Sequence, residues 1–227
     1  MILDYRHEWK HRINDLDCLC LRQRLRAVMT PDPYAGEDGK YRVRSLYFDN
    51  LGDQALWEKL DGVNRREKFR IRCYNEDPSL IRLEKKSKWN GLGNKVSAHL
   101  TPEQVQAILD GNLDWMKESG NSLVTELHEK MLQGGLRPKT LVDYTREPFV
   151  FAPGNVRVTL DYEIRTGLRS TDFLNPDCVT IPAGDQFGIL EVKYDEYLPD
   201  VIRNAVQIPG RRSAAFSKYA VCRLYDF

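Results

Sequence analysis

Charged residues recur two positions apart in several short segments of this chain, with apolar or small residues between them. Arginine and lysine donate charge-assisted hydrogen bonds to phosphate oxygens, and the guanidinium fork matches two oxygens at once. Carboxylates are hard oxygen ligands that hold divalent cations beside phosphates. These residue types indicate a metal-dependent site for a linear polyphosphate or a nucleoside triphosphate. The segments are Arg6–Lys10, Lys68–Arg72, Leu83–Lys86, Arg157–Asp161 and Leu190–Lys193.

The spacing of these charges indicates the elements that position them. Successive side chains of a β-strand point to opposite faces, so each segment places an ionic row on one face and an apolar row on the other. A solvated face of an antiparallel sheet is the simplest explanation of such rows. Against it, the rows carry six cations and three carboxylates, a surplus of three, although the formal net charge of the chain is +1. The counted residues are Arg70, Arg72, Lys86, Arg146, Arg157 and Lys193 against Glu84, Asp161 and Glu191.

An internal surplus of positive charge repels itself, and each unpaired ion is costly to remove from water. An anionic ligand would compensate that cost. About seven antiparallel strands would also expose edges, and closure into a barrel removes them. Strands are expected over residues 3–10, 42–48, 68–74, 80–88, 139–151 (interrupted at Pro148), 156–165 and 188–194. Helices are expected to follow Asn14, Asp53, Thr101, Ser122 and Pro199, and to span 213–224.

Length and composition limit the domain count and the class of protein. The 227 residues, 41% hydrophobic and 30% charged, predict one α+β domain over residues 1–227. The near-neutral charge argues against a nucleic-acid partner or a polybasic membrane surface. The sequence shows no signal peptide and no bilayer-spanning run, which predicts a cytoplasmic protein without a membrane segment. Five scattered cysteines fit reduced thiols, and Cys18 and Cys20 lack a second pair for zinc.

Eight short motifs, in order along nearly the whole chain, resemble the vacuolar transporter chaperone (VTC) domain of the triphosphate tunnel metalloenzymes. The resemblance implies a closed eight-stranded antiparallel β-barrel tunnel with helices packed outside. It also implies binding of ATP triphosphate and transfer of its terminal phosphate to inorganic polyphosphate. The motifs are Glu8-Trp-Lys10, Ser45-Leu-Tyr47-Phe-Asp49, Arg70-Ile-Arg72, Leu83-Glu84-Lys-Lys86, Tyr144-Thr-Arg146, Arg157-Val-Thr-Leu-Asp161, Leu190-Glu191-Val-Lys193 and Phe216-Ser-Lys218-Tyr.

Site residues follow from the resemblance position by position. The expected catalytic cations are Arg70, Arg72, Lys86, Arg146, Arg157, Lys193 and Lys218. Lys10 and Lys95 are expected to bind phosphate, and Arg211 or Arg212 to replace a family lysine where this chain has Ala214-Ala215. Glu191 matches the family's metal-binding glutamate, and Glu8, Glu84 and Asp161 are further candidates from the ionic rows. The expected cofactor is Mn²⁺ or Mg²⁺.

Three functions remain open at this point. The first is an ATP-dependent polyphosphate polymerase, for which export of the product would require a membrane-protein partner. The second is a hydrolase of tripolyphosphate or nucleoside triphosphates, in which water replaces the acceptor chain. The third is a polyanion-binding module without catalytic activity. The residues that bind the donor are the same in all three, and the sequence does not predict an oligomeric state.

Overall fold

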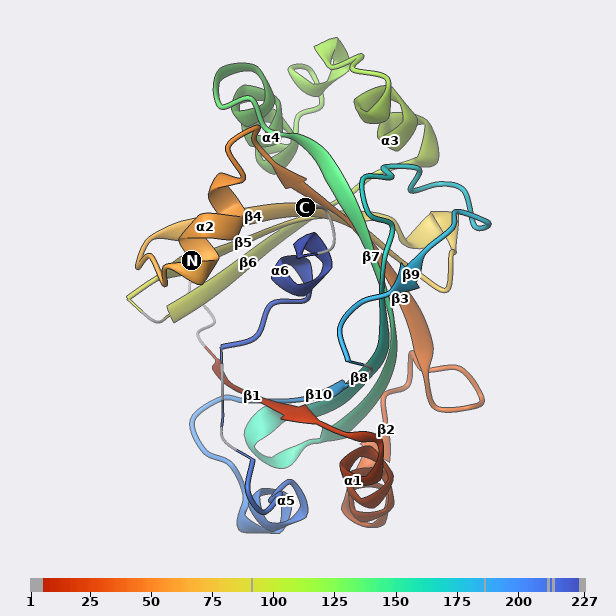
Figure 1. Cartoon of the computed structure of the whole chain (residues 1–227), viewed down its shortest axis with the longest axis vertical. Helices are drawn as coiled ribbons and strands as arrows, with labels where there is room; N and C mark the ends of the chain where they lie inside the picture. The colour runs from red at the N-terminus through yellow and green to blue at the C-terminus, as the bar shows by residue number, and fades with distance from the viewer. Residues whose placement is uncertain (1–5, 91, 186, 212, 214, 225–227) are drawn as a thin grey trace. The chain divides into compact units, whose positions relative to one another are not determined.

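The computed structural model describes residues 6–90, 92–185, 187–211, 213 and 215–224 (Figure 1). The chain forms two compact units, each assembled from three separate stretches of sequence. The first unit contains Met1–Arg42, Tyr144–Ile164 and Pro182–Ser217, and the second contains Val43–Asp143, Arg165–Ile181 and Lys218–Phe227. The single domain over 1–227 stays a prediction.

The first unit is an antiparallel sheet with two helices on one face. Its strand order is β1-β10-β8-β7, with β2 paired to β7 and β9 to β8. Helices α1 and α5 lie together against the sheet (Figure 1). The bounds are β1 His7–Ile13, α1 Asp15–Val28, β2 Thr30–Pro31, β7 Arg137–Phe151, η3 Pro153–Asn155, β8 Val156–Thr166, β9 Ile181–Pro182, β10 Gly188–Tyr194 and α5 Asp200–Ala205. The part of β7 from Tyr144 onward belongs to this unit, and so does the part of β8 up to Ile164.

Alternation along the strands separates an apolar face from an ionic face in the first unit. Val158 and Leu160 of β8 and Leu190 and Val192 of β10 are buried in a core with residues of both helices. The intervening residues of these strands point to the opposite face. That face carries Glu8, Lys10, Tyr144, Arg146, Arg157, Thr159, Asp161, Glu191 and Lys193.

The second unit is an antiparallel sheet of order β7-β3-β4-β5-β6. Helices α3 and α4 gather at one end of it (Figure 1) and pack on its apolar face, while Tyr219 of α6 stacks on Tyr47 of β3 on the other face. The further bounds are β3 Tyr41–Asp49, α2 Gln54–Leu60, β4 Arg66–Tyr74, η1 Pro78–Leu80, β5 Arg82–Trp89, β6 Leu92–His99, α3 Pro102–Leu109, η2 Asp114–Met116, α4 Ser122–Gln133 and α6 Lys218–Arg223.

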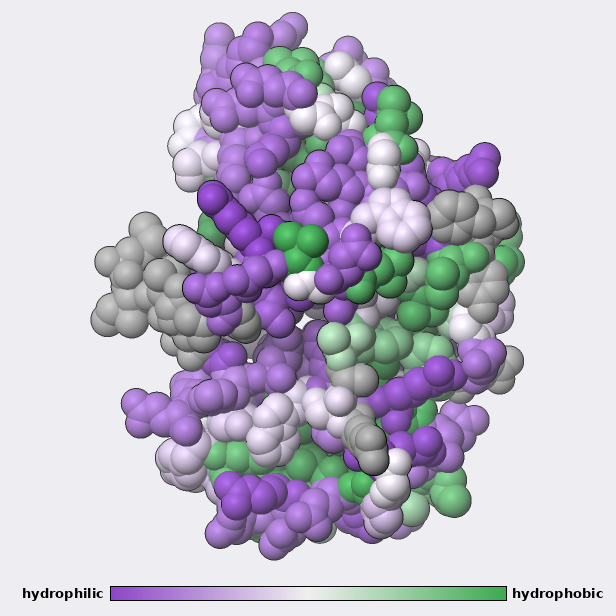
Figure 2. Space-filling view, turned by 60° about the vertical axis from the view of Figure 1, so that its left-hand side comes forward, coloured by the Kyte–Doolittle hydropathy of each residue, from purple (hydrophilic) through white to green (hydrophobic). Residues whose placement is uncertain are grey.

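The core of the second unit uses one face of each strand. Leu46, Phe69, Ile71 and Leu83 are at most 2% exposed and pack with residues of α3 and α4. The alternate residues form the ionic face, which carries Ser45, Tyr47, Lys68, Arg70, Arg72, Glu84, Lys86, Lys95 and Ser97. Hydrophilic residues predominate on the molecular face shown in Figure 2, in keeping with the charge content.

The structure confirms most expected elements and corrects several. Helix α1 begins after Asn14 and α3 after Thr101, each with the reciprocal hydrogen bonds of a capping box. Strand β6 was not expected, because its polar, glycine-containing sequence lacks a strand pattern. Strand β7 continues through Pro148, and the C-terminal helix begins only at Lys218. Asp53 is at the N-terminus of α2 without a capping hydrogen bond.

The closed eight-stranded barrel is corrected to an open antiparallel order. Eight strands form the main path as expected, but among the described residues that path ends at β1 and at β6. Unpaired strand edges tolerate water when they carry charged or polar residues. Both end strands have them, including Lys10 and Arg12 in β1 and Asn94 and Lys95 in β6. Closure is therefore not required to protect these edges.

Candidate functional site

Two glutamates and two lysines form a compact ionic group on β1 and β10 of the first unit. The register places Glu8 opposite Lys193 and Lys10 opposite Glu191. Lys10 Nζ is 3.3 Å from both Glu8 Oε1 and Glu191 Oε2. Lys193 Nζ is 2.7 Å from Glu191 Oε1 and 3.7 Å from Glu8 Oε1. Each ammonium thus contacts both carboxylates, and each carboxylate contacts both ammoniums.

The two carboxylates of this group keep Lys10 in its charged form. Burial on its own lowers the pKa of Lys10, but the carboxylates of Glu191 and Glu8 outweigh it and raise that pKa above its ordinary value. Lys10 therefore stays protonated at any physiological pH. A permanently charged ammonium can donate charge-assisted hydrogen bonds to phosphate oxygens.

Glu8 and Glu191 fit a divalent cation better than the other predicted ligands do. Mg²⁺ typically uses one or two carboxylates together with substrate phosphates, and this pair provides two. The hydroxyl of Thr159, opposite Glu191 in the register, is buried and has no hydrogen-bond partner among the described residues. No group of three His, Cys, Asp or Glu side chains that could hold a metal occurs in the described part of the chain. A metal here would need phosphate or water oxygens to complete its ligands.

Asp161, another predicted metal ligand, is occupied by an arginine. Its two carboxylate oxygens accept hydrogen bonds of 2.7 Å from Nε and Nη2 of Arg146. Asp161 is fully buried, and the side chain of Arg146 is 12% exposed. Burial disfavours the charged guanidinium, yet Asp161 keeps the pKa of Arg146 well above its ordinary value. These two hydrogen bonds use Nε and Nη2 of Arg146 and do not involve Nη1.

Arg157 is oriented by residues outside the ionic rows. Its Nη2 donates a hydrogen bond of 3.0 Å to the hydroxyl of Tyr41 and lies 2.9 Å from Asp32 Oδ2. Among the described residues its buried Nε has no hydrogen-bond partner. Asp32 is itself buried, so the guanidinium is fixed by a rigid acceptor. Asp32 was not predicted as a site residue, because Thr30-Pro-Asp-Pro33 reads as a turn. Tyr41 was not predicted either.

The ionic face of the second unit is centred on Glu84. Its Oε2 accepts hydrogen bonds from Arg70 Nε (2.7 Å) and Nη2 (2.6 Å), and its Oε1 is 3.2 Å from Lys95 Nζ. Arg72 Nη1 is 3.9 Å from Glu84 Oε2. Burial raises the pKa of Glu84, but Arg70, Arg72 and Lys95 lower it far below the usual range. Glu84 therefore orients three predicted phosphate ligands, and both of its carboxylate oxygens contact cations.

Tyr47 and Ser45 accept hydrogen bonds from the arginines of this face. Arg70 Nη1 donates to the Tyr47 hydroxyl at 3.0 Å, and Arg72 Nε donates to Ser45 Oγ at 3.0 Å. Burial raises the pKa of Tyr47, but Arg70 and Arg72 outweigh it and lower that pKa to about 8. Tyr47 belongs to a motif quoted from the sequence, although it was not among the expected site residues.

Two further predicted cations, Lys86 and Lys218, lie in the second unit. Lys86 of β5 is opposite Lys95 of β6, and Lys218 begins α6, next to Tyr219. The Tyr219 hydroxyl donates a hydrogen bond of 2.6 Å to Asp49 Oδ2, which fixes α6 to the end of β3. Asp49 also accepts from the backbone N–H groups of Ala55 and Leu56, so it does the capping of α2 that was expected of Asp53.

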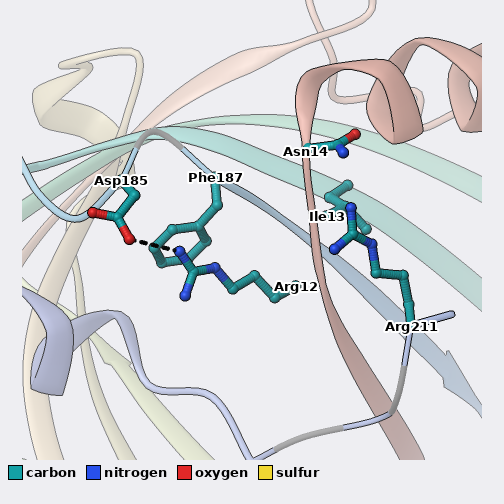
Figure 3. A pocket seen from close by; sticks show the side chains of 6 residues that line it. All are labelled: Arg12, Ile13, Asn14, Asp185, Phe187 and Arg211. Atoms are coloured by element: carbon teal, nitrogen blue, oxygen red, sulfur yellow. Dashed lines mark hydrogen bonds and ion pairs between the residues drawn. The ribbon is translucent and has the colours of Figure 1, made fainter.

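Arg211 is paired with Asp17 in the first unit. Its Nη2 is 2.7 Å from Asp17 Oδ2, and it lines a cavity of about 410 Å³ in the first unit with Arg12, Ile13, Asn14, Asp185 and Phe187 (Figure 3). Arg12 pairs with Asp185 and lies over the Phe187 ring. The cavity therefore has paired cations, and none of its described lining residues favours an anion. Arg212 and Ala214 lie outside the described residues, and Ala215 is exposed.

No helix in the described part of the chain is both long and apolar enough to span a membrane.

None of the curated proteins that were compared matches this chain. The chain is similar to the solved PH1819 protein of Pyrococcus horikoshii OT3, with 14% identity, a TM-score of 0.50 and 96% of each chain covered. This likeness concerns the fold alone.

Two more solved structures are similar to the chain at lower TM-scores. The PH1012 protein of Pyrococcus horikoshii OT3 has 13% identity and a TM-score of 0.48, covering 95% of this chain and 98% of the other. A putative adenylate cyclase of Bacillus halodurans has 13% identity and a TM-score of 0.45, covering 82% and 78%. The family model of the VTC domain matches residues 5–225, nearly the whole sequence, and the chain therefore belongs to the VTC domain family.

Proposed function

We propose that this VTC domain is a metal-dependent phosphotransferase that binds the triphosphate of ATP and transfers its terminal phosphate to a growing inorganic polyphosphate chain. The observation that carries the proposal is the reciprocal group of Glu8, Lys10, Glu191 and Lys193. It combines two carboxylates suited to one divalent cation with two ammoniums suited to phosphate oxygens.

The proposed reaction needs no side-chain nucleophile. An anionic terminal oxygen of the acceptor attacks the γ-phosphorus of ATP and forms a new P–O bond. The bond from the γ-phosphorus to the β,γ-bridging oxygen breaks, and ADP leaves with that electron pair. The protein contributes position and charge, as in other phosphoryl transfers.

The fixed arginines are suited to this role. Arg146 and Arg157 in the first unit, and Arg70 and Arg72 in the second, are each oriented by a neighbouring carboxylate or hydroxyl. Orientation before binding lowers the entropy lost when a guanidinium engages phosphate oxygens. Mn²⁺ or Mg²⁺ held by Glu8 and Glu191 would neutralise negative charge on the transferred group. Lys10 and Lys193 would bind phosphate oxygens beside it.

Incubation of the purified protein with ATP and Mn²⁺, followed by separation of the products by length, tests the proposal. Long polyphosphate with stoichiometric ADP supports it. Free phosphate and ADP without any polymer would assign the protein as a hydrolase, and unchanged ATP despite measurable binding would assign it as a binding module. Glu129→Gln on the exposed side of α4 serves as a matched control for substitutions of site glutamates.

A further inference from the structure

Helix α1 has apolar residues on two sides, although only one side packs on the sheet of the first unit (Figure 1). Cys18, Leu21 and Leu25 are buried on that side. On the opposite side Leu16 is 68% exposed and Leu19 is 49% exposed. A helix that packs on a sheet usually has polar residues on the side turned away from the core. The exposed apolar residues therefore do not serve the core of the first unit.

These exposed residues form one continuous stripe. Residues three, four and seven positions apart lie on the same side of a helix. We call this side of α1 the outer stripe, and its members are Leu16, Leu19, Cys20, Gln23 and Ala27, all of them exposed. Gln23 is its one polar member. Covering such a stripe with another helix would remove apolar surface from water, which favours association.

Charged residues border the outer stripe with opposite signs at its two ends. On one edge Asp15 is in the first turn of α1 and Arg26 in the last. On the other edge Asp17 precedes Arg24. At about 100° of rotation per residue, the members of each pair lie about 20° apart around the helix axis. Each edge is therefore acidic toward the N-terminus of α1 and basic toward its C-terminus.

This pattern is complementary to itself. A two-fold axis perpendicular to α1 places two copies of the helix antiparallel and brings the same edge of each together. In one register, Asp15 faces Arg26 of the second copy. In the same register Asp17 faces Arg24 of the second copy, because both pairs are centred just after Cys20. The antiparallel arrangement of the two helix dipoles is also favourable.

The first of these ion pairs can form without leaving a buried charge unpaired. Asp15 is exposed, and within the described part of the chain it is in no ion pair. The side chain of Arg26 is 57% exposed, and its Nη2 is 3.3 Å from Glu147 Oε1. Glu147 also accepts a hydrogen bond of 2.7 Å from Arg22 Nε. The buried carboxylate therefore keeps a cation when Arg26 turns to a second copy.

We propose that the outer stripe of α1 is the interface of a homodimer, in which α1 of one copy packs antiparallel on α1 of a second copy. Asp17 already contacts Arg211 within its own chain. The principal ion pair of the interface is therefore that of Asp15 with Arg26. The balance of acids and bases favours this occupant over an anionic membrane, which selects a cationic surplus. One helix face is a small interface, so the dissociation constant should be roughly 1–100 μM. The inference is independent of the proposed phosphotransfer.

Analytical ultracentrifugation of the full chain up to about 0.2 mM tests the dimer. Wild type should be dimeric at the highest concentrations. Leu19→Glu should raise the dissociation constant about tenfold or more, because it places a charge in the apolar centre. Leu132→Glu is the matched control, since Leu132 is 62% exposed on α4 of the second unit, and it should dimerise as wild type does. Thermal melts establish that each variant is folded. Monomeric wild type, or unchanged association of Leu19→Glu, would overturn the inference.

Charge reversal tests the antiparallel register. Asp15→Arg and Arg26→Glu should each weaken the dimer about 3- to 30-fold, because each places like charges opposite one another. An equal mixture of the two variants should associate with about wild-type affinity, since the reversed charges then face opposite charges. A mixture that associates no better than either variant alone would contradict the register.

Cys20 reports the position of the two-fold axis. It is exposed and lies next to the axis in this register, so two copies of it should come within reach of a disulfide. Mild oxidation with copper phenanthroline should link wild type into a dimer and leave Cys20→Ser and Leu19→Glu unlinked. A dimer whose cross-linking does not depend on Cys20 would place the interface elsewhere. Monomeric protein that instead sediments with phosphatidylglycerol vesicles would assign the outer stripe to a membrane, and either result would overturn the inference.

Discussion

The carboxylate of Asp161 is held by the guanidinium of Arg146 through two parallel hydrogen bonds of 2.7 Å. This geometry assigns Asp161 to the orientation of Arg146. Asp161→Asn should therefore raise the KM for ATP about tenfold or more while leaving the Mn²⁺ concentration for half-maximal activity unchanged. The uncompensated arginine should also lower the free energy of unfolding by about 3–5 kcal/mol. Steady-state kinetics over a Mn²⁺ series and urea melts measure both, and a shift only in the Mn²⁺ requirement would instead make Asp161 a metal ligand.

Glu191→Gln should abolish turnover and leave the protein folded. Its carboxylate is one of the two suited to the metal, and it contacts both Lys10 and Lys193. Loss of the carboxylate removes a charged ligand from the metal that would neutralise the transferred group. Product analysis with ATP and Mn²⁺, together with circular dichroism, compares this variant with Glu129→Gln, which should behave as wild type. Undiminished activity of Glu191→Gln would refute the metal assignment.

Glu84 should make the protein sensitive to acid. Its pKa is lowered in the folded state by Arg70, Arg72 and Lys95, despite burial. The folded state therefore binds fewer protons than the unfolded state between the two pKa values. The resulting stability is fully present above the ordinary glutamate pKa near 4.5 and is lost as pH falls toward the folded-state pKa.

Urea melts from pH 7 to pH 3 measure this dependence. Glu84→Gln should lower the free energy of unfolding at pH 7 by about 3–5 kcal/mol, because it leaves the arginines without their carboxylate. Its stability should also decline less steeply below pH 4.5 than that of wild type. If the stability of wild type and of Glu84→Gln fell equally steeply below pH 4.5, Glu84 would be excluded as the source of the acid sensitivity.

Stability should rise with pH just above pH 8. Burial lowers the folded-state pKa of Lys68 from 10.5 to about 8, and the neighbouring arginines lower that of Tyr47 from 10.0 to about 8. Above pH 8 the folded state releases these protons before the unfolded state does, so the free energy of unfolding increases. Above pH 9 the buried thiol of Cys73, whose pKa is raised to about 11, opposes the trend.

Lys68→Met should show the cost of keeping this lysine charged. Below pH 8 the folded state carries an ammonium that burial disfavours, so its removal should stabilise the protein by roughly 1–3 kcal/mol at pH 7. Chemical denaturation at pH 7 and pH 9 measures the difference, which should shrink at the higher pH. A destabilised variant at pH 7 would mean that packing of the lysine stem outweighs its charge.

The buried pair of Arg44 and Asp143 offers a test on the apolar side of the second unit. Arg44 is 4% exposed, and its Nη2 is 2.9 Å from Asp143 Oδ2. Arg44→Met alone should destabilise by about 3–5 kcal/mol, because it leaves a buried carboxylate without a partner. Arg44→Met with Asp143→Leu should recover most of that loss. A double-mutant cycle by thermal melts measures the coupling free energy between Arg44 and Asp143. Additive effects of the two substitutions would contradict the prediction.

The alternation of charge and apolarity was sufficient to predict which strands carry the ionic residues and which face they use. It could not give the partners, because those depend on pairing between distant segments. Asp32 reaches Arg157 from a turn, and Tyr219 reaches Asp49 from the last helix. Strand β6 escaped prediction for a related reason: its strand conformation depends on pairing with β5, whereas its own residues have weak β-propensity. The open strand order likewise depends on long-range pairing that alternation does not encode.

The pairing of β1 with β10 has a consequence for how the chain is made. His7 is opposite Tyr194, so about 180 residues must be synthesised after the start of β1 before its neighbour β10 begins to exist. Contacts so distant in sequence slow folding and leave apolar strand surface exposed for longer. A nascent chain stalled before residue 188 should depend on chaperones and be degraded by proteases that spare the finished molecule. C-terminal deletions that remove β10 should accumulate as aggregates, because the N-terminal strand then has no partner.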